Sequence, residues 1–239
     1  MNKTKIDWTD CTWNPTTGCT KISAGCANCY AELMAKRCKL MGLVKYRNGF
    51  DLTLHHDMLN KKMSYRDPKM IFVNSMSDIF HKDIPLEFID EVFMYMRRAP
   101  QHIFQVLTKR GDRLEELSPH LFWHDNIWMG VTVETEQVLG RIDNLRTTPA
   151  IVRFVSIEPL LGPLPALNLE GIHWVIVGGE SGPKARPMDL DWVRPIRDKC
   201  IEMNIPFFFK QIGGFRKQEG YNILDGQVWH QFPENHIKN

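Results

Sequence analysis

The chain has 239 residues, of which 43% are hydrophobic and 24% are charged, and its formal net charge is +2. This composition is that of an ordinary globular protein, and we expect one α/β domain over residues 1–239. No apolar run approaches the roughly 20 residues of a membrane span, and the N-terminus has no apolar signal segment, so we expect a cytoplasmic protein without a membrane partner. The small net charge neither requires nor excludes a nucleic-acid partner.

The predicted elements begin with a short strand at residues 12–13, a loop at 18–30 that contains three cysteines, and a helix at 30–41. From about residue 70, short apolar runs rich in β-branched and aromatic residues alternate with amphipathic stretches. Six further strands are expected at residues 70–74, 102–107, 126–133, 151–157, 172–177 and 206–209. Apolar residues at helical spacing predict helices at 85–98, 135–146 and 190–203.

Two segments interrupt this alternation. Residues 44–68 are polar and rich in His and Lys, and residues 160–171 contain Gly and Pro in place of a helical period. We expect both to be irregular connections, and we expect an irregular tail from about residue 213 that covers one end of the fold. Because strands alternate with helices, the sequence predicts an α/β fold, a partial TIM-type (βα) barrel of about six to seven parallel strands.

Each expected strand turns polar at its C-terminal end. In a βα barrel these ends meet on one face, where such folds place their active sites. Helix capping would explain a residue such as Ser77 individually. It does not explain charged residues within or just beyond apolar strands, where a charge is costly without a partner or ligand. These residues are Lys109, Glu134, Glu158 and Lys210, and they predict a charged, water-poor pocket.

A glycine-rich turn, residues 178–182, follows one of these strands. Glycine lets backbone N–H groups approach a carboxylate, phosphate or ribose, and Glu180 adds a carboxylate acceptor at the same place. A tight turn without a ligand is the alternative interpretation. The turn lacks the third glycine and the helix start of a Rossmann fingerprint. We interpret Gly178, Gly179 and Glu180 as candidate ligand-binding residues.

Four of the six cysteines lie between Cys11 and Cys29, and in a reducing cytosol thiols or metal ligands are expected rather than disulfides. A closed zinc site would use Cys11 as fourth ligand, but only Cys26 and Cys29 have the two-residue spacing of zinc ribbons. A redox pair at Cys26 and Cys29 would leave Cys19 unexplained. A 4Fe-4S cluster on Cys19, Cys26 and Cys29 leaves one iron open for a substrate or cofactor. The role of Cys11 stays open.

Three cysteines in one loop after a first strand, inside a βα barrel, resemble the radical S-adenosylmethionine (SAM) enzymes. The spacing differs, because six residues separate Cys19 from Cys26 and Asn28 stands where those enzymes have an aromatic residue. Tyr30 is a candidate substitute beside the adenine. The resemblance implies that the open iron binds SAM and that the reduced cluster cleaves it to methionine and a 5'-deoxyadenosyl radical.

Residues 6–19, 72–80 and 177–182 more closely resemble the phage gene product 37 and 68 family, and this resemblance covers nearly the whole chain. Members of that family are regarded as radical-SAM-like and have no settled reaction. The family is associated with a companion called the three-Cys-motif partner protein. The resemblance therefore implies a protein partner in addition to an electron donor.

The resemblance to radical SAM enzymes also implies roles for the strand-end residues. Those at the second-strand position are assigned to the methionine end of SAM: Ser75, Ser77 and Asp78. Ribose or adenine contacts are assigned to Glu134, Glu158, Gly178, Gly179 and Glu180. The binding of an anionic group on the cofactor or substrate is assigned to Lys109, Arg110 and Lys210. Together with the phage association, these cations lead us to expect a nucleic-acid or nucleotide substrate.

A second hypothesis stays open from the sequence. A zinc- or cluster-stabilised protein would recognise nucleic acid or a protein partner without performing catalysis. Metal and sulfide content, and the response of a reduced cluster to SAM, distinguish this protein from an enzyme.

Overall fold

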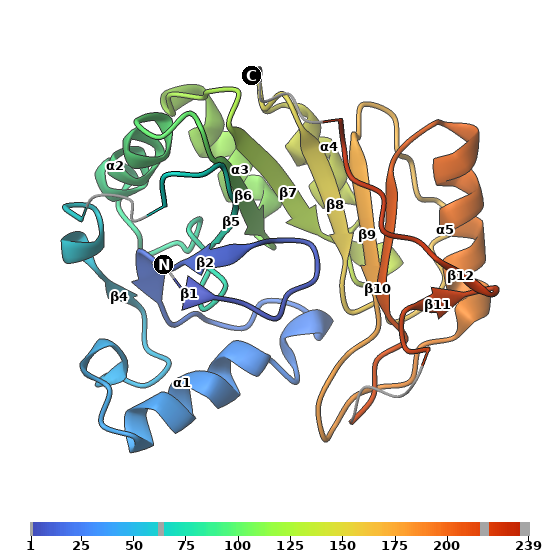
Figure 1. Cartoon of the computed structure of the whole chain (residues 1–239), viewed down its shortest axis with the longest axis horizontal. Helices are drawn as coiled ribbons and strands as arrows, with labels where there is room; N and C mark the ends of the chain where they lie inside the picture. The colour runs from blue at the N-terminus through green and yellow to red at the C-terminus, as the bar shows by residue number, and fades with distance from the viewer. Residues whose placement is uncertain (1, 62–64, 216–219, 235–239) are drawn as a thin grey trace.

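One large, open sheet forms the centre of the computed structural model, which describes residues 2–61, 65–215 and 220–234 (Figure 1). Its eight strands follow the order β1-β2-β5-β6-β7-β8-β9-β10, and all pairs are parallel except β1 with β2. The strands are β1 (Asn2–Lys3), β2 (Cys11–Trp13), β5 (Met70–Val73), β6 (Ile103–Thr108), β7 (Ile127–Thr132), β8 (Arg153–Ile157), β9 (Trp174–Gly178) and β10 (Phe207–Gln211). The seven parallel strands form a half-barrel, which confirms the predicted fold class.

The strands read as continuous apolar runs because both faces of the sheet are covered. Every residue of β7 and β9 is buried, as expected for parallel strands with packing on each side. One face packs against the helices. The opposite face carries a mainly aromatic cluster that includes Trp128, Phe154 and Trp174. Trp8 from the N-terminal segment closes this cluster, and the side chain of Gln105 on β6 donates to its backbone oxygen at 3.1 Å.

Within the part of the chain that the structure describes, five α-helices accompany the sheet, and α2 and α5 lie near its opposite ends (Figure 1). They are α1 (Tyr30–Leu40), α2 (Leu86–Arg97), α3 (Gly111–Leu117), α4 (Gly140–Arg146) and α5 (Leu190–Glu202). The expected helix at 135–146 is instead a 3-10 turn, η5 (Glu136–Val138), followed by α4. The turn has the i to i+3 hydrogen bonds that often begin a helix. Helix α3 was not predicted, because it is short and buries few apolar side chains.

The connections contain more order than the sequence predicted. The segment 44–68 supplies β4 (Thr53–Leu54), which pairs with β3 (Thr16–Thr17), and two 3-10 turns, η2 (Val44–Tyr46) and η3 (His56–Met58). Residues 160–171 are irregular as expected, and four of their five leucines fill the core in place of a helix. Residues 62–64 of the first segment and 216–219 and 235–239 of the tail lie outside the described residues.

The predicted irregular tail contains a small hairpin, β11 (Ile223–Leu224) with β12 (Gln227–Val228). Its two turn residues, Asp225 and Gly226, both have positive φ, of 52° and 78°. An Asp-Gly pair favours this two-residue turn because both positions need the left-handed region. The sequence contained this signal, which the prediction of an irregular tail overlooked.

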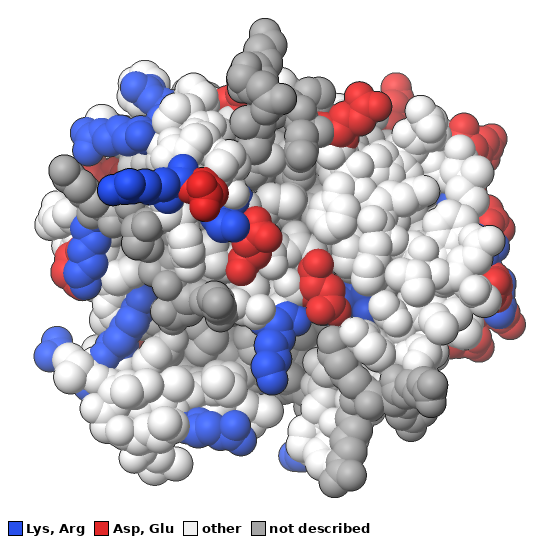
Figure 2. Space-filling view, in the orientation of Figure 1, with Lys and Arg blue, Asp and Glu red and all other residues white. Residues whose placement is uncertain are grey.

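Charged side chains are unevenly placed on the face seen in Figure 2. Lysine and arginine lie mainly on the side of α1 and β4, whereas aspartate and glutamate line the edge near α5. Among the described residues, no helix has the length and apolar character required to cross a membrane.

The close packing of the aromatic cluster makes Gly130 a sensitive position. A Cβ atom at Gly130 would lie 2.4 Å from the buried Phe154 ring. We expect Gly130→Ala to lower the free energy of unfolding by about 1–3 kcal/mol, because the buried ring cannot move aside freely. Denaturant unfolding measures this change. Gly140→Ala is the matched control, since nothing lies within 4 Å of its Cβ position, and an equal effect of both substitutions would contradict the packing argument.

Candidate functional site

The three clustered cysteines lie in a loop at the C-terminal ends of the parallel strands. Cys19 follows Gly18, Cys26 ends the 3-10 turn η1 (Ala24–Cys26), and Cys29 directly precedes α1. All three are free thiols and partly exposed. Gly18 has a φ of 83°, and a Cβ atom there would lie 2.2 Å from the Asp51 carbonyl oxygen, so the entry to the loop requires glycine.

Residues that follow four different strands bind this loop directly. They come after β5, β6, β7 and β9, so the loop spans most of the width of the half-barrel. The contacts are Tyr30 hydroxyl to Ser75 O, Arg110 Nη2 to Thr20 O at 3.1 Å, Gly25 N to Glu134 Oε1 at 3.2 Å, and Asn28 Nδ2 to Glu180 Oε2 at 2.9 Å. The predicted convergence of strand ends around the cysteine loop is therefore present in the structure.

Glu134 is fully buried beneath the loop. Its carboxylate accepts from the Gly25 N–H and forms an ion pair with Arg141 at 2.9 Å. Burial alone would raise the pKa of Glu134, but Lys109, the Ser23 hydroxyl and Arg141 outweigh burial and lower it. Glu134 is therefore an ionised group whose observed contacts hold the loop in place.

Glu180 is held in the same way by Arg186. The guanidinium of Arg186 donates to both carboxylate oxygens, at 2.6 and 2.9 Å, and its backbone N–H donates to one of them. Arg186 also donates to the carbonyl oxygen of Ala24 in the cysteine loop at 3.0 Å. Burial would raise the pKa of Glu180, but the bonds from Arg186 and Asn28 lower it to about 2. The sequence prediction missed Arg186, which lies six residues after Glu180 in an irregular segment.

The residues assigned to the methionine end of SAM are engaged by the protein itself. Asp78 accepts from the Thr108 hydroxyl at 2.8 and 2.9 Å and from the Lys109 N–H at 3.1 Å. Ser77 shares a 2.7 Å hydrogen bond with the Thr16 hydroxyl. These contacts join the ends of β5 and β6 to the start of the loop, and the assignment of these side chains to a cofactor stays a prediction.

Glu158 and Lys210 form an ion pair of 2.7 Å at the ends of β8 and β10. The intervening Gly178 leaves room for this pair, because a Cβ atom there would lie 2.8 Å from Glu158 Oε1. Gly179 lies against the next segment, where a Cβ atom would be 1.9 Å from the Ile212 carbonyl oxygen. The two glycines thus have a packing role, which supports the tight-turn interpretation of this segment.

Positive charge lies next to the thiols. Arg110 Nη2 is 3.7 Å from Cys19 Sγ, and Lys21 interacts electrostatically with Cys26 and Cys29. Burial first and Asp78 second raise the pKa of the Cys19 thiol, and the Arg110 hydrogen bond acts in the opposite direction. A metal removes this proton, because a coordinating thiol is deprotonated.

The remaining cysteines are placed differently. Cys11 is 2% exposed within the hydrophobic core, and Cys200 is fully buried on α5. This packing gives Cys11 a place in the core at the start of β2, and whether it joins the metal site stays an open question. Cys38 is partly exposed on α1.

The chemistry of the donor set bears on the kind of centre it fits. Within the described residues, no three His, Cys, Asp or Glu side chains are arranged to hold a single metal ion. Three free thiols from one loop, with Arg110 and Lys21 nearby, are the type of ligand that iron-sulfur clusters take.

The Glu180 clamp predicts a dependence of stability on acid pH. Because the folded-state pKa is about 2 and the ordinary value is 4.5, its stabilisation is complete above pH 4.5 and declines as pH falls toward 2. We expect the free energy of unfolding to fall over this range by up to about 3 kcal/mol more in the wild type than in Glu180→Gln. Urea unfolding at several pH values measures this difference. The exposed-site control Glu202→Gln should behave as the wild type, and equal acid sensitivity in Glu180→Gln would refute the clamp.

Comparison with known proteins places this geometry in a family and a fold. No curated protein matches the sequence. A cysteine-to-serine mutant of spore photoproduct lyase has a similar structure, with a TM-score of 0.50 and 13% identity over 77% of this chain and 62% of that chain. Spore photoproduct lyase complexed with dinucleoside spore photoproduct aligns at a TM-score of 0.44 and 12% identity, over 69% of this chain and 54% of that chain.

At this identity the likeness concerns the fold, which is similar to the half-barrel of spore photoproduct lyase, a radical-SAM enzyme. The chain spans about 62% of the length of the first of these structures. The family profile that matches, over residues 3–233, has no assigned activity, and the resemblance to the phage gene product 37 and 68 family stays a prediction. The chain belongs to the family described as "Protein of unknown function (DUF5131)".

Proposed function

We propose that this protein is a radical-SAM-type enzyme that carries a 4Fe-4S cluster on Cys19, Cys26 and Cys29. One observation carries the proposal: three free, partly exposed thiols of one loop lie over the strand ends of a half-barrel. The fold of spore photoproduct lyase supports it, because that enzyme is of the same type. Three ligands in place of four leave one iron open for SAM.

The chain's own residues prepare the site in three ways. Glu134, Glu180 and Arg186 hold the loop against the sheet and so fix where the thiols lie. Arg110 and Lys21 place positive charge beside an anionic, thiolate-ligated centre. When bound, the cluster supplies the electron that cleaves SAM to methionine and a 5'-deoxyadenosyl radical.

Candidate SAM contacts are the groups near the loop that retain free hydrogen-bonding capacity. The Tyr30 ring is about half exposed, with a side chain that reaches the end of β5. The ion pair of Glu158 and Lys210 is partly exposed at the ends of β8 and β10 and offers both a carboxylate and an ammonium group. These groups are the candidates to orient the ribose, adenine or carboxylate of SAM.

The proposed reaction requires an electron donor, and the three-Cys-motif partner protein stays a predicted companion.

All six cysteines are free thiols in the described structure. That state suits a reducing compartment such as the cytoplasm, where an exposed cluster is also better protected from oxidation.

The alternative is a metal-stabilised binding protein without catalysis. It shares the loop and the thiols, so the two functions differ in their chemistry. A zinc protein would lack iron and sulfide, and a scaffold with a cluster would bind no SAM. The strand-end position of the loop favours the enzyme, since that face is where βα folds place their active sites.

We expect protein purified without oxygen to contain about four iron and four sulfide per chain. After reduction it should release 5'-deoxyadenosine from SAM. The variants Cys19→Ala, Cys26→Ala and Cys29→Ala should lose the cluster, because each removes one of three ligands. Cys38→Ala, which removes a partly exposed thiol on α1, is the matched control and should retain it.

Metal analysis and chromatography of the reaction mixture provide the measurements. Stoichiometric zinc without iron, or a cluster that survives in all three ligand variants, would contradict the proposed ligand set. An intact cluster with no 5'-deoxyadenosine would favour the non-catalytic alternative.

A further inference from the structure

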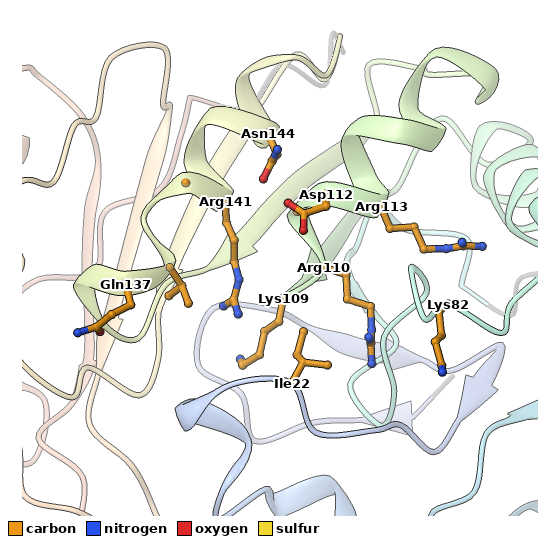
Figure 3. Close-up of a pocket in the computed structure, with 12 residues that line it drawn as sticks. Ile22, Lys82, Lys109, Arg110, Asp112, Arg113, Gln137, Arg141 and Asn144 are labelled. Atoms are coloured by element: carbon orange, nitrogen blue, oxygen red, sulfur yellow. The ribbon is translucent and has the colours of Figure 1, made fainter.

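A cavity of about 650 Å³ lies beside the cysteine loop, between the segments that follow β6 and β7 (Figure 3). Its walls come from the cysteine loop, the segment after β5, the start of α3 and the region of η5 and α4. The volume is in the range of sites that hold a nucleotide-sized ligand. We propose that this cavity binds phosphate groups, those of a nucleotide or of a nucleic-acid backbone.

The lining is strongly cationic. Five of the lining residues are basic, and one is acidic, Asp112. The basic residues are Lys82, Lys109, Arg110, Arg113 and Arg141. Two buried carboxylates neutralise part of this charge, since Glu134 pairs with Arg141 at 2.9 Å and Asp78 lies 3.8 Å from Arg110 Nε. Five cations against three carboxylates still leave an excess of two positive charges.

The excess charge lies on groups that can reach a ligand. The ammonium groups of Lys82 and Lys109 form no hydrogen bond or ion pair with any described residue. Arg110 is nine-tenths buried, and its Nε has no hydrogen-bond partner among the described residues. Figure 3 shows the side chains of Lys109, Arg110 and Arg141 directed to the same side, toward Ile22, whereas Arg113 extends away. Arg110 and Arg141 are partly neutralised by Asp78 and Glu134, so the unpaired charge of this group lies on Lys109, and a phosphate beside Lys109 would meet N–H donors from neighbouring cations.

The other lining residues suit the remaining parts of such a ligand. Ile22 and Val138 provide apolar surface, and Gln137 provides an amide group that both donates and accepts hydrogen bonds, while the Asn144 amide already donates to Glu115 at 2.6 Å. A base or sugar attached to the phosphate would find both kinds of contact. Phosphate contacts fix the position of a nucleic acid, while base contacts supply selectivity.

The cavity shares one residue with the cysteine site. Arg110 lines the cavity and also donates to Thr20 and to Cys19 Sγ. A phosphate held by Lys109 and Arg110 would therefore place the attached nucleotide beside the loop on which the proposed cluster is built. A role as enzyme substrate rests on the proposed function, but phosphate binding in the cavity does not.

The test measures binding to the full chain without SAM or reductant, so it is independent of catalysis. Fluorescence anisotropy with a labelled oligothymidylate of about ten nucleotides, at several salt concentrations, gives the affinity and its salt dependence. We expect Lys109→Glu and Lys82→Glu each to weaken binding about tenfold and to reduce the salt slope by about one. Lys61→Glu, outside the cavity lining, makes the same charge change and should bind as the wild type. Circular dichroism confirms that each variant is folded.

Competition identifies the source of the phosphate. Displacement of the probe by ATP at micromolar concentration assigns the cavity to a nucleotide, and displacement by unlabelled oligonucleotide alone assigns it to nucleic acid. The proposal is overturned if the wild type binds neither probe nor ATP, or if both cavity variants bind like Lys61→Glu. If the protein binds phosphate but forms no 5'-deoxyadenosine, the proposed enzymatic function is contradicted and the proposed phosphate site is not.

Discussion

The site depends on how buried carboxylates fasten an irregular loop to the ends of a sheet. Glu134 and Glu180 each pair with an arginine and also accept hydrogen bonds from the cysteine loop. A buried carboxylate is stable only if its charge is compensated, so each arginine is as necessary as the loop contact. The loop has no regular structure of its own beyond one 3-10 turn, and the fastening therefore determines where its three thiols lie.

Charged residues at the strand ends look alike in the sequence but have different roles in the structure. Carboxylates at the ends of β7 and β9 hold the loop, whereas Lys210 on β10 pairs with Glu158, and Lys109 after β6 lines the cavity without an ion pair to any described residue. The half-barrel thus brings a thiol-rich loop and a cationic cavity to one face, with Arg110 in contact with both. The guanidinium group of Arg110 is the physical link between the proposed cluster and the proposed substrate site.

The sequence was sufficient to predict the strands and the position of the loop, because buried parallel strands are continuous apolar runs and α2 has a clear apolar face. It also indicated which residues gather at the strand ends. It could not reveal that Glu134 and Glu180 hold the loop, because this role depends on their arginine partners. Arg141 lies on a short helix and Arg186 in an irregular segment, and neither gives a periodic pattern in the sequence. Helix α3 carries too few apolar residues to produce a period.

The central claim is that Cys19, Cys26 and Cys29 hold a cluster with one iron open to SAM. Electron paramagnetic resonance of the reduced, anaerobically purified protein tests it most directly. The account predicts the signal of a reduced 4Fe-4S cluster, and a change in its g values when SAM is added. Two results would contradict the account: a spectrum that SAM leaves unchanged, or protein that contains zinc in place of iron and gives no cluster signal.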